Sequence, residues 1–525
     1  MKKVLCIAMA LVLALGMLSF VQADEGEKLS FDILTRYHSE GNGNMNYNEG
    51  NPMSDYMEEK TGIHINWTQL PATDATVKLN AIIASGDLPD ALCMVQPSNA
   101  QLLEWAEDGI ISPMEDLVAE YMPELSAILA DREDIRTAVT SPEGHIYAFP
   151  RTDGGIHVLV SNKIYVYGPW YQAYLDAGNP EVDTTEDYAN MLRYFRDNDM
   201  NGNGDPSDEL PVSGAGDALI SNLINPYTLM GSINGLYLED GQVVSPYLKD
   251  EYREALRYAH SLWDEGLIDV ELFTQNGSQV QALVNRENET DRVVGGFSGL
   301  WDGSYVNASI VPYDTYIAIG PLVGPEGVKQ ATYSKSDVQT GTFVIFNSCE
   351  HVPELMQWLD WLYSYDGTML MAYGLEGISW NWSDTPSIAG EEKSVERTMP
   401  VSELYTKNLQ WLPNMPCYRT PEVKYVESGV AGGSGIDLYV SSMRYLPYGD
   451  PDKAISPLMW QTADQTEDRS LYESTVMSYI NECKTAFVTG KMDIDAEWDT
   501  YVKTLQDMDF EGYLALMQEI VDANS

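Results

Sequence analysis

Alternation between strand-like and helix-like segments near the start of the chain constrains its fold more than any other feature. Three short apolar runs predict β-strands: residues 31–36, 63–67 and 91–95. Two helix-like segments lie between them, at residues 52–60 and 73–85, and each is closed by a glycine, Gly62 and Gly86. Strands that alternate with helices form a mainly parallel sheet with helices on both faces. We therefore expect an α/β fold.

A second α/β pattern follows residue 150. Strands are expected near residues 158–160, 293–297 and 342–346, and helices over residues 185–196, 250–265 and 353–363. From residue 476 onward the apolar residues recur at helical spacing only, which predicts a helical C-terminus. With 44% apolar residues and 525 residues in all, the chain is large enough for more than one packed core.

The first residues predict export. Two lysines precede an apolar run that ends near Phe20, and the small residues after it predict cleavage after Ala23, which makes residues 1–23 a signal peptide. Cys6 precedes the apolar region, so it is not the cysteine of a lipoprotein signal, and there is no lipobox. No later segment is apolar enough to span a bilayer. We expect a secreted, extracytoplasmic protein at the cell surface.

Charge and cysteine spacing exclude several classes of function. The formal net charge is −50, which repels nucleic-acid backbones and anionic lipid surfaces, so neither is an expected partner. Four cysteines remain after cleavage and none is arranged as C-x-x-C, which argues against a zinc cluster or a redox motif: Cys93, Cys349, Cys417 and Cys483. The sequence leaves their redox state open.

A loop at the end of the helix expected over residues 185–196 spaces short oxygen-bearing side chains as a calcium ion needs them. The candidate ligands are the side chains of Asp199, Asn201, Asn203, Asp208 and Glu209 and the carbonyl of Asp205. Gly204 lets the backbone turn sharply. The loop differs from an EF-hand because Leu210 occupies the twelfth position, where an EF-hand has a bidentate glutamate. A structural Ca²⁺ is the expected cofactor, and the alternative is an Asx-rich surface turn that binds nothing.

Candidate ligand-binding residues follow from the positions of strand ends and loops. Ligands of parallel sheets bind beyond the carboxyl ends of the strands, which nominates Tyr37, His38, Gln96 and Ser98. Arg151 is nominated as a hinge residue. Exposed aromatic plates suit the apolar faces of sugar rings and carboxylates suit their hydroxyls, which nominates Trp301, Asp302, Trp380 and Trp382. Trp358, Trp361 and Trp498 lie on expected helices and are assigned to packing.

Seven fragments, taken in order, resemble the extracellular solute-binding proteins of carbohydrate ABC importers. The likeness covers roughly residues 30 to 520 and is closest to the branch that includes alginate-oligosaccharide binders and lipoprotein-type sugar receptors. The fragments are TGIHINW (61–67), LNAIIASGDLPD (79–90), GHIYAFP (144–150), the loop at 199–209, YGLEG (373–377), FVTG (487–490) and WDTYVK (498–503).

This resemblance implies two α/β lobes of the type II periplasmic-binding-protein kind, each with a mainly parallel sheet, joined by hinge strands. The expected division is residues 24–148 with about 315–363 in lobe 1, and residues 149–314 with about 364–525 in lobe 2. It also implies a structural calcium in the loop at 199–209. The implied function is an importer subunit that closes on an oligosaccharide and delivers it to the permease. The sequence has no visible signal for homo-oligomerisation, so a monomer is expected.

Two other functions remain open from the sequence. A secreted glycan hydrolase would also show aromatics and carboxylates, and 80 acidic residues could contain a catalytic pair. None of the six histidines forms H-E-x-x-H and there is no G-x-S-x-G, so no enzyme is expected. A receptor for a peptide or another small solute would share the fold, and fold alone does not determine the ligand. The identity, length and charge of the glycan are not predicted.

Overall fold

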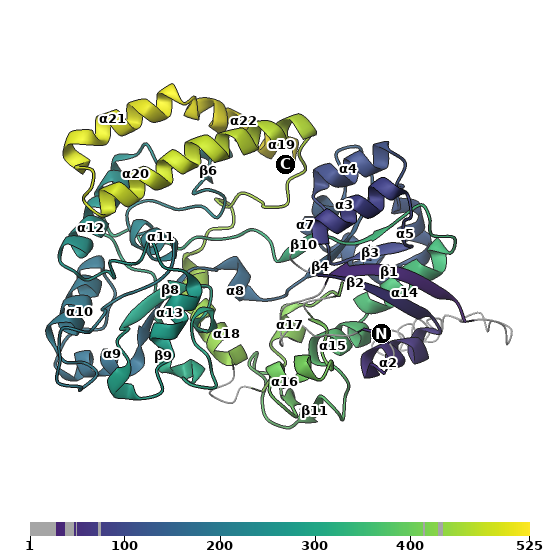
Figure 1. Ribbon diagram of the computed structural model, residues 1–525, viewed down its shortest axis with the longest axis horizontal. Helices are drawn as coiled ribbons and strands as arrows, with labels where there is room; N and C mark the ends of the chain where they lie inside the picture. Colours follow the sequence, from purple (N-terminus) through teal and green to yellow (C-terminus); the bar gives the residue numbers. More distant parts are fainter. Residues whose placement is uncertain are drawn as a thin grey trace, which may run out of the picture.

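The first lobe is built on a five-stranded sheet in the order β2-β1-β3-β10-β4 (Figure 1). The computed structural model describes residues 28–36, 47–48, 50–71, 75–412, 415–428 and 434–524, so the signal segment and two nominated residues, Tyr37 and His38, lie outside the described residues. The strands are β1 (Ser30–Arg36), β2 (His64–Leu70), β3 (Ala91–Cys93), β4 (Phe149–Thr152) and β10 (Val338–Ile345).

Strands β1, β2 and β3 are parallel, as the sequence predicts, whereas β10 is antiparallel to both β3 and β4. Helix α2 (Pro52–Thr61) shows how local signals position this lobe. Asn51 caps its N-terminus by accepting from the backbone N–H of Met53, a proline opens its first turn, and Gly62 closes it in the left-handed conformation. The expected helix is therefore confirmed at both ends.

Other helices cover the two faces of this sheet. They are α3 (Ala75–Ser85), α4 (Asn99–Glu107), α5 (Glu115–Tyr121), α6 (Pro123–Asp131), α7 (Glu133–Val139) and α14 (Val352–Tyr363). After α14 the chain stays in the first lobe as α15 (Tyr365–Tyr373), β11 (Trp380–Ser383), β12 (Ser394–Arg397), α16 (Val401–Thr406) and α17 (Pro421–Lys424).

The expected assignment of residues beyond 364 to lobe 2 differs from this placement. Met371, Trp411 and Cys417 are fully buried in the core that contains Trp358 of α14. Only Ser364 separates α14 from α15, so α15 turns back on α14 and its apolar residues pack there without crossing to the other lobe. The sequence shows the apolar residues but not which core receives them.

The second lobe has a three-stranded sheet of order β8-β5-β9, and both of its pairings are antiparallel. The expectation of a parallel sheet in this lobe is therefore wrong. Its strands are β5 (Lys163–Tyr167), β8 (Gly296–Gly299) and β9 (Tyr316–Ile319), so residues 316–319, expected in lobe 1, pair here. The strand expected at 158–160 is also wrong, because α8 (Ile156–Leu159) lies there and the strand follows it.

Helices and a hairpin surround this second sheet. They are α9 (Gly168–Asp176), α10 (Thr185–Asp197), α11 (Ala218–Ile224), β6 (Tyr237–Glu239), β7 (Gln242–Val244), α12 (Asp250–Asp264), α13 (Gly277–Val284) and α18 (Ser434–Tyr445). Short 3₁₀ turns lie at η1 (Glu289–Asp291), η2 (Asp302–Ser304), η3 (Tyr313–Thr315) and η5 (Leu446–Tyr448). Among the described residues, no helix is both long enough and apolar enough to cross a membrane.

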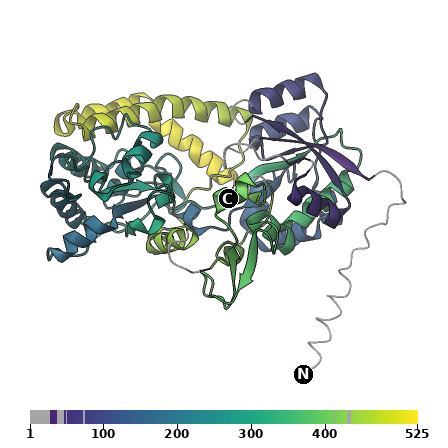
Figure 2. The ribbon, with the colours of Figure 1, turned by 60° about the horizontal axis from the view of Figure 1, so that its bottom comes forward.

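A C-terminal layer of helices lies over the second lobe (Figures 1 and 2). It consists of α19 (Ala463–Tyr472), the π-helical turn η6 (Glu473–Met477), α20 (Ser478–Val488), α21 (Ile494–Asp507) and α22 (Phe510–Ala523). Val476, Phe487 and Ile520 bury their side chains in the second-lobe core. Trp460 precedes the layer and is buried in the first lobe, where its indole N–H donates to the Ala138 carbonyl at 3.2 Å.

Candidate functional site

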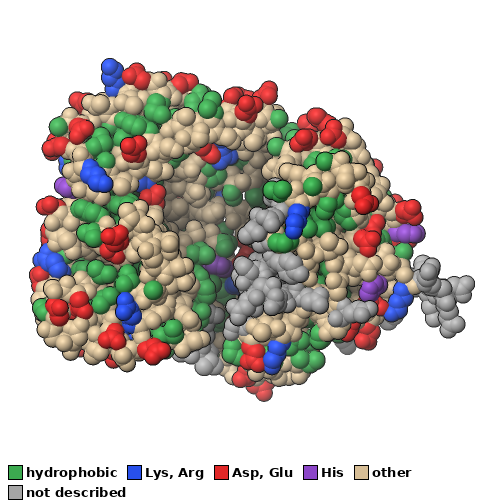
Figure 3. All heavy atoms as spheres, in the orientation of Figure 1, with side chains coloured by type: hydrophobic (Ala, Val, Ile, Leu, Met, Phe, Trp, Pro, Cys, Tyr) green, Lys and Arg blue, Asp and Glu red, His purple; other side chains and the backbone are tan. Residues whose placement is uncertain are grey.

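The space between the lobes is the candidate site, and Figure 3 shows that this face of the molecule is hollowed there. The chain crosses between the lobes next to β4, before β10 and after α17 (Figure 1). Two of these crossings are tied together: the backbone N–H of Asp153 donates to the Asp337 carbonyl, and that of Thr152 donates to the Cys417 carbonyl. The carboxyl ends of the first-lobe strands therefore lie beside the hinge.

Two of the nominated first-lobe residues form a polar chain at these strand ends. Gln339 of β10 accepts from Gln96 Nε2 at 3.2 Å and from Arg151 Nη1 at 3.2 Å, and Arg36 donates to Gln96 Oε1 at 3.3 Å. Gln96 adopts a left-handed backbone conformation, which ends β3 and turns its amide toward the hinge. Ser98 is set apart from this chain, because its hydroxyl caps α4 by accepting from Gln101 N.

A charge cluster stabilises the hinge itself. Arg419 is buried and donates to Asp153 Oδ2 at 2.7 Å, and Arg151 and His157 lie 3.9 and 3.7 Å from the same carboxylate. Desolvation raises the pKa of Asp153, but Arg419, Lys424 and the other nearby cations outweigh it and hold that pKa well below its ordinary range. Burial lowers the pKa of His157 to about 3, so the imidazole is neutral.

The nominated pair Trp301 and Asp302 lies on the second lobe just after β8. The Trp301 ring packs on Tyr313 with centroids 5.3 Å apart, and it lies over Gly303, where a Cβ would approach the indole to 2.5 Å. The Trp301 indole is thus held in place by the Tyr313 ring and by the backbone at Gly303. Asp302 is only 1% exposed; its Oδ1 accepts from Gly303 N at 2.9 Å, and its Oδ2 has no partner among the described residues.

Burial shifts the ionisation of this part of the second lobe. Desolvation, together with the negative charges of Asp437 and Asp314, raises the pKa of Asp302 to about 7. Lys163, fully buried on β5, donates to the Leu300 carbonyl at 2.7 Å, and desolvation lowers its pKa to about 7. The sequence did not nominate Asp437, because one carboxylate among 80 acidic residues carries no distinguishing local pattern.

The other two nominated tryptophans lie on strand β11, which Figure 1 shows at the lower edge of the first lobe. Trp380 is 5% exposed and its indole N–H donates to the Gly374 carbonyl at 3.0 Å, so both of its faces are used in the core. Trp382 is 42% exposed and meets the edge of Trp380 with ring centroids 5.3 Å apart. Of the two, only Trp382 offers a free aromatic surface.

The loop at residues 199–209 folds with its polar side chains turned inward. Asp199 accepts from the backbone N–H groups of Asn203 and Gly204, Asn201 accepts from Asn203 N, and Asn203 accepts from Asp205 N, at distances of 2.7 to 3.1 Å. Asp205 turns its carboxylate to Ser207 instead, which leaves only its carbonyl available. The side-chain oxygens of Asp199, Asn201 and Asn203 thus face the inside of the loop, and their role as calcium ligands stays a prediction.

Asp208 and Glu209 complete this loop from its other end. Asp208 accepts from the side-chain amides of Asn201 and Asn203, and Glu209 Oε1 accepts from Met200 N at 2.8 Å. Glu209 is buried, its Oε2 has no partner among the described residues, and desolvation raises its pKa. In the described part of the chain no three His, Cys, Asp or Glu side chains are grouped as a metal site. Such a grouping leaves out amides, and two of the candidate ligands of this loop, Asn201 and Asn203, are amides.

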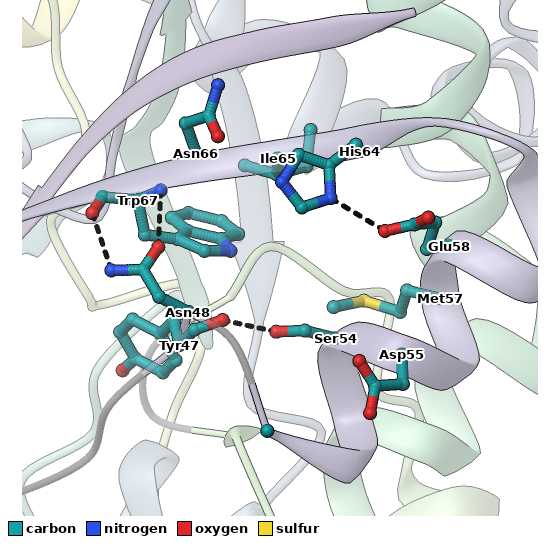
Figure 4. Close-up of a pocket in the computed structure, with 11 residues that line it drawn as sticks. Tyr47, Asn48, Ser54, Asp55, Met57, Glu58, His64, Ile65, Asn66 and Trp67 are labelled. Atoms are coloured by element: carbon teal, nitrogen blue, oxygen red, sulfur yellow. Dashed lines mark hydrogen bonds and ion pairs between the residues drawn. The ribbon is translucent and has the colours of Figure 1, made fainter. Parts of the chain in front are cut away.

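A separate cavity of about 440 Å³ lies on the first lobe between α2 and β2 (Figure 4). His64 Nδ1 lies 2.6 Å from Glu58 Oε2, and the Asn48 amide pairs with both backbone groups of Trp67, which satisfies the exposed edge of β2. None of the residues nominated from the sequence lines it. We assign this cavity to the architecture of the edge strand.

Comparison with known families gives a match over most of the chain. The model of the bacterial extracellular solute-binding proteins matches residues 48–369. The fructooligosaccharide ABC transporter substrate-binding protein FusA of Streptococcus pneumoniae is 27% identical over an alignment of 495 residues, and the match covers 89% of this chain and 86% of FusA. The polygalacturonan/rhamnogalacturonan-binding protein YtcQ of Bacillus subtilis is 20% identical, over 68% of this chain and 70% of YtcQ.

Solved structures show the same fold. FusA in complex with kestose superposes with a TM-score of 0.73 at 24% identity, covering 94% of this chain and 99% of FusA. A FusA EF-hand mutant in complex with fructo-nystose gives 0.72 at 23% identity, with the same coverage. A human-milk-oligosaccharide (HMO) binding solute-binding protein of Bifidobacterium longum infantis gives 0.77 at 17% identity, covering 95% and 99%. The two-lobe fold is therefore confirmed.

Proposed function

The chain belongs to the bacterial extracellular solute-binding proteins, and we propose that it is the substrate-binding subunit of an ABC importer that captures an oligosaccharide between its lobes. The main observation in favour of a sugar ligand is on the second lobe, where the Trp301 indole lies beside the buried Asp302. An aromatic face and a carboxylate acceptor side by side match the two surfaces of a sugar ring. The extended likeness to FusA, a fructooligosaccharide binder, supports the same ligand class.

Capture proceeds by closure of the two lobes on the ligand. Trp301 and Asp302 belong to the second lobe and the Gln96, Gln339 and Arg151 chain belongs to the first, and the proposal assigns them to opposite sides of the bound sugar. A sugar that contacts both sides stabilises the closed state by the free energy of those added contacts. The permease then meets both lobes in one arrangement and receives the sugar.

Calcium binding at the loop of residues 199–209 is a second part of the proposal. Carboxylate, amide and carbonyl oxygens are the ligands that Ca²⁺ prefers, and Asp199, Asn201, Asn203, Asp208 and Glu209 offer them here. The unpartnered Glu209 Oε2 fits this assignment, because a buried carboxylate oxygen without a donor is costly unless a cation neutralises it. The ion would stabilise the second lobe far from the sugar.

Export and the absence of catalysis complete the proposal. Removal of residues 1–23 after Ala23 would release a secreted protein, which acts as a monomer at the cell surface. The relatives are described as binding proteins, which supports a binder rather than a glycan hydrolase. A receptor for a peptide or another small solute is the alternative that the same fold would serve.

The test is a thermal-shift panel on the chain from Asp24 onward, with calcium held constant. Neutral and acidic oligosaccharides are added one at a time, and each that raises the melting temperature is checked by chromatography after overnight incubation. A shift with one glycan class and intact sugar supports the importer subunit. Cleaved sugar would make the protein an enzyme, and a shift only with peptides would replace the sugar by a peptide.

A further inference from the structure

Three aspartates lie on separate elements that pack together beside Trp301, because η3 contacts α18 and Tyr313 of η3 packs on the Trp301 ring. Asp302 lies in η2, Asp314 in η3, and Asp437 in the first turn of α18. The buried oxygens Asp302 Oδ2 and Asp437 Oδ2 both lack a hydrogen-bond partner among the described residues. Asp302 is 1% exposed, so water reaches it poorly. A buried acceptor without a donor costs about 1–3 kcal/mol, which a ligand that supplies the donor recovers.

The first turn of α18 lies at the boundary between the lobes. Tyr439, two residues after Asp437, packs on Tyr425 of the first lobe with ring centroids 4.8 Å apart. The Tyr425 hydroxyl in turn accepts from Ile156 N, at the start of α8 in the hinge, at 2.9 Å. These contacts place α18 at the lobe boundary, and α18 is a different element from the one that carries the nominated Asp302.

No cation in the described residues forms an ion pair with Asp302 or Asp437. Lys163 donates its ammonium to the Leu300 carbonyl, and burial lowers its pKa to about 7 although the charge of Asp302 raises it, so Lys163 offsets the charge of Asp302 only in part. The hinge cations Arg419 and Arg397 are engaged by Asp153 and Glu427 respectively. The negative charge beside Trp301 is thus left for a ligand to meet, and the ligand must bring hydrogen-bond donors without bringing further negative charge.

We infer that Asp302 and Asp437 form a specificity-determining subsite that accepts hydrogen bonds from the hydroxyls of an uncharged sugar and rejects uronates. The inference rests on the proposed function and narrows its ligand to neutral oligosaccharides. A vicinal diol supplies two donors, one for each free oxygen, while its ring covers the Trp301 plate. A uronate carboxylate would instead face two carboxylates at close range in a poorly solvated site, which is an electrostatic penalty.

The experiment measures affinity by isothermal titration calorimetry near neutral pH with saturating calcium. The neutral probes are kestose, nystose, cellotriose, xylotriose and mannotriose, and the acidic probe is trigalacturonate. The proteins are the natural chain, Asp302→Asn, Asp437→Asn, and Asp499→Asn as a matched control on the exposed face of α21. Circular dichroism and melting temperature establish that each variant is folded.

We expect the natural chain to bind at least one neutral probe and not trigalacturonate. Each single variant at Asp302 or Asp437 should weaken that neutral probe by about 10- to 100-fold, because a hydrogen bond to a charged acceptor is lost, whereas Asp499→Asn should not. Unchanged affinity in both folded variants, or tighter binding of trigalacturonate by the natural chain, overturns the inference but leaves the importer subunit standing. No binding of any sugar overturns both.

Discussion

Two enclosed aspartates of this protein show opposite electrostatics. Asp153 at the hinge is met by Arg419 at 2.7 Å and by Arg151 and His157 within 4 Å, and its pKa is held well below its ordinary range. Asp302 on the second lobe has no ion pair in the described residues, and desolvation raises its pKa to about 7, although each of the two aspartates has one oxygen without a hydrogen-bond partner.

The difference indicates which partner each carboxylate serves. A carboxylate whose partners come from its own chain fixes the backbone around it, and removing it leaves those partners unpaired. A buried carboxylate without a cationic partner lowers stability, which is the pattern expected of a group that acts on a ligand. Asp153 thus stabilises the hinge, whereas we propose that Asp302 binds the ligand.

The largest expected effect is on stability, from Asp153→Asn. The variant leaves the buried Arg419 without its ion pair and weakens the contacts of Arg151 and His157. Removing one partner of such a pair costs about 3–5 kcal/mol. Urea unfolding monitored by tryptophan fluorescence gives the free energy of unfolding.

The control for this comparison is Asp302→Asn, which removes a charge that has no partner. We expect its free energy of unfolding to equal or exceed that of the natural chain, since the amide is cheaper to bury than the carboxylate. If Asp302→Asn destabilises the protein as much as Asp153→Asn does, the distinction between hinge and binding carboxylates is wrong.

Glu209 extends the comparison to a third carboxylate, which we assign to a cation. Its free Oε2 and raised pKa resemble those of Asp302. With a Kd of about 10⁻⁵ to 10⁻⁴ M, calcium near 1 mM should add about 1.4–2.7 kcal/mol to stability. Thermal unfolding with chelator and with calcium restored measures this difference.

Matched variants test the ligand set of that loop. Asn203→Ala should abolish the calcium-dependent rise in melting temperature, because it removes an inward oxygen. Asp205→Asn should preserve the rise, because its carboxylate turns to Ser207 and only its carbonyl is assigned to the ion. A melting temperature that is insensitive to chelator in the natural chain contradicts the calcium assignment.

Local chemistry is what the sequence predicted well. The ends of α2 and the inward side chains of the loop at 199–209 depend on neighbouring residues only, so the sequence alone predicts them. The division of the cores is not local: residues after α14 look equally suited to either lobe until their contacts are known. Asp437 could not be nominated from the sequence, because it is 135 positions from Asp302 in the chain and only the fold brings the two charges near each other.

The nominated tryptophans offer a sharper test within the sugar site. Trp301→Ala removes a plate held by Tyr313 and Gly303, and it should weaken a bound neutral oligosaccharide by about 10- to 30-fold through lost stacking. Trp382→Ala removes an exposed ring from the β11–β12 hairpin, and no change is expected. Titration calorimetry with the best neutral probe separates the two, and equal losses would move the binding surface toward the first-lobe hairpin.

The smallest expected effect is on pH dependence, and its sign distinguishes the two aspartates. The folded pKa of Asp302 lies above its unfolded value, so ionisation opposes folding, and apo stability should rise as pH falls from about 8 toward about 5. Asp153 has the opposite shift, and its contribution is retained over this range because both of its pKa values lie below it. Affinity for a neutral sugar should move the other way.

The opposite pH dependences of stability and of affinity both arise from protonation of Asp302. Protonated Asp302 accepts hydroxyl donors less well, so affinity should fall by about three- to tenfold over the same range, with Asp437, whose pKa burial raises to about 6, adding to the loss. Asp314, Lys163 and Tyr165 also face this region. The Asp302→Asn variant retains all three groups, so a difference between its pH profile and that of the natural chain is due to Asp302. Melting curves and calorimetry at each pH, with calcium saturating, measure both quantities. Asp302→Asn should flatten both profiles; if both slopes persist in that variant, another group holds the proton, and Asp302 is not the carboxylate that the sugar meets.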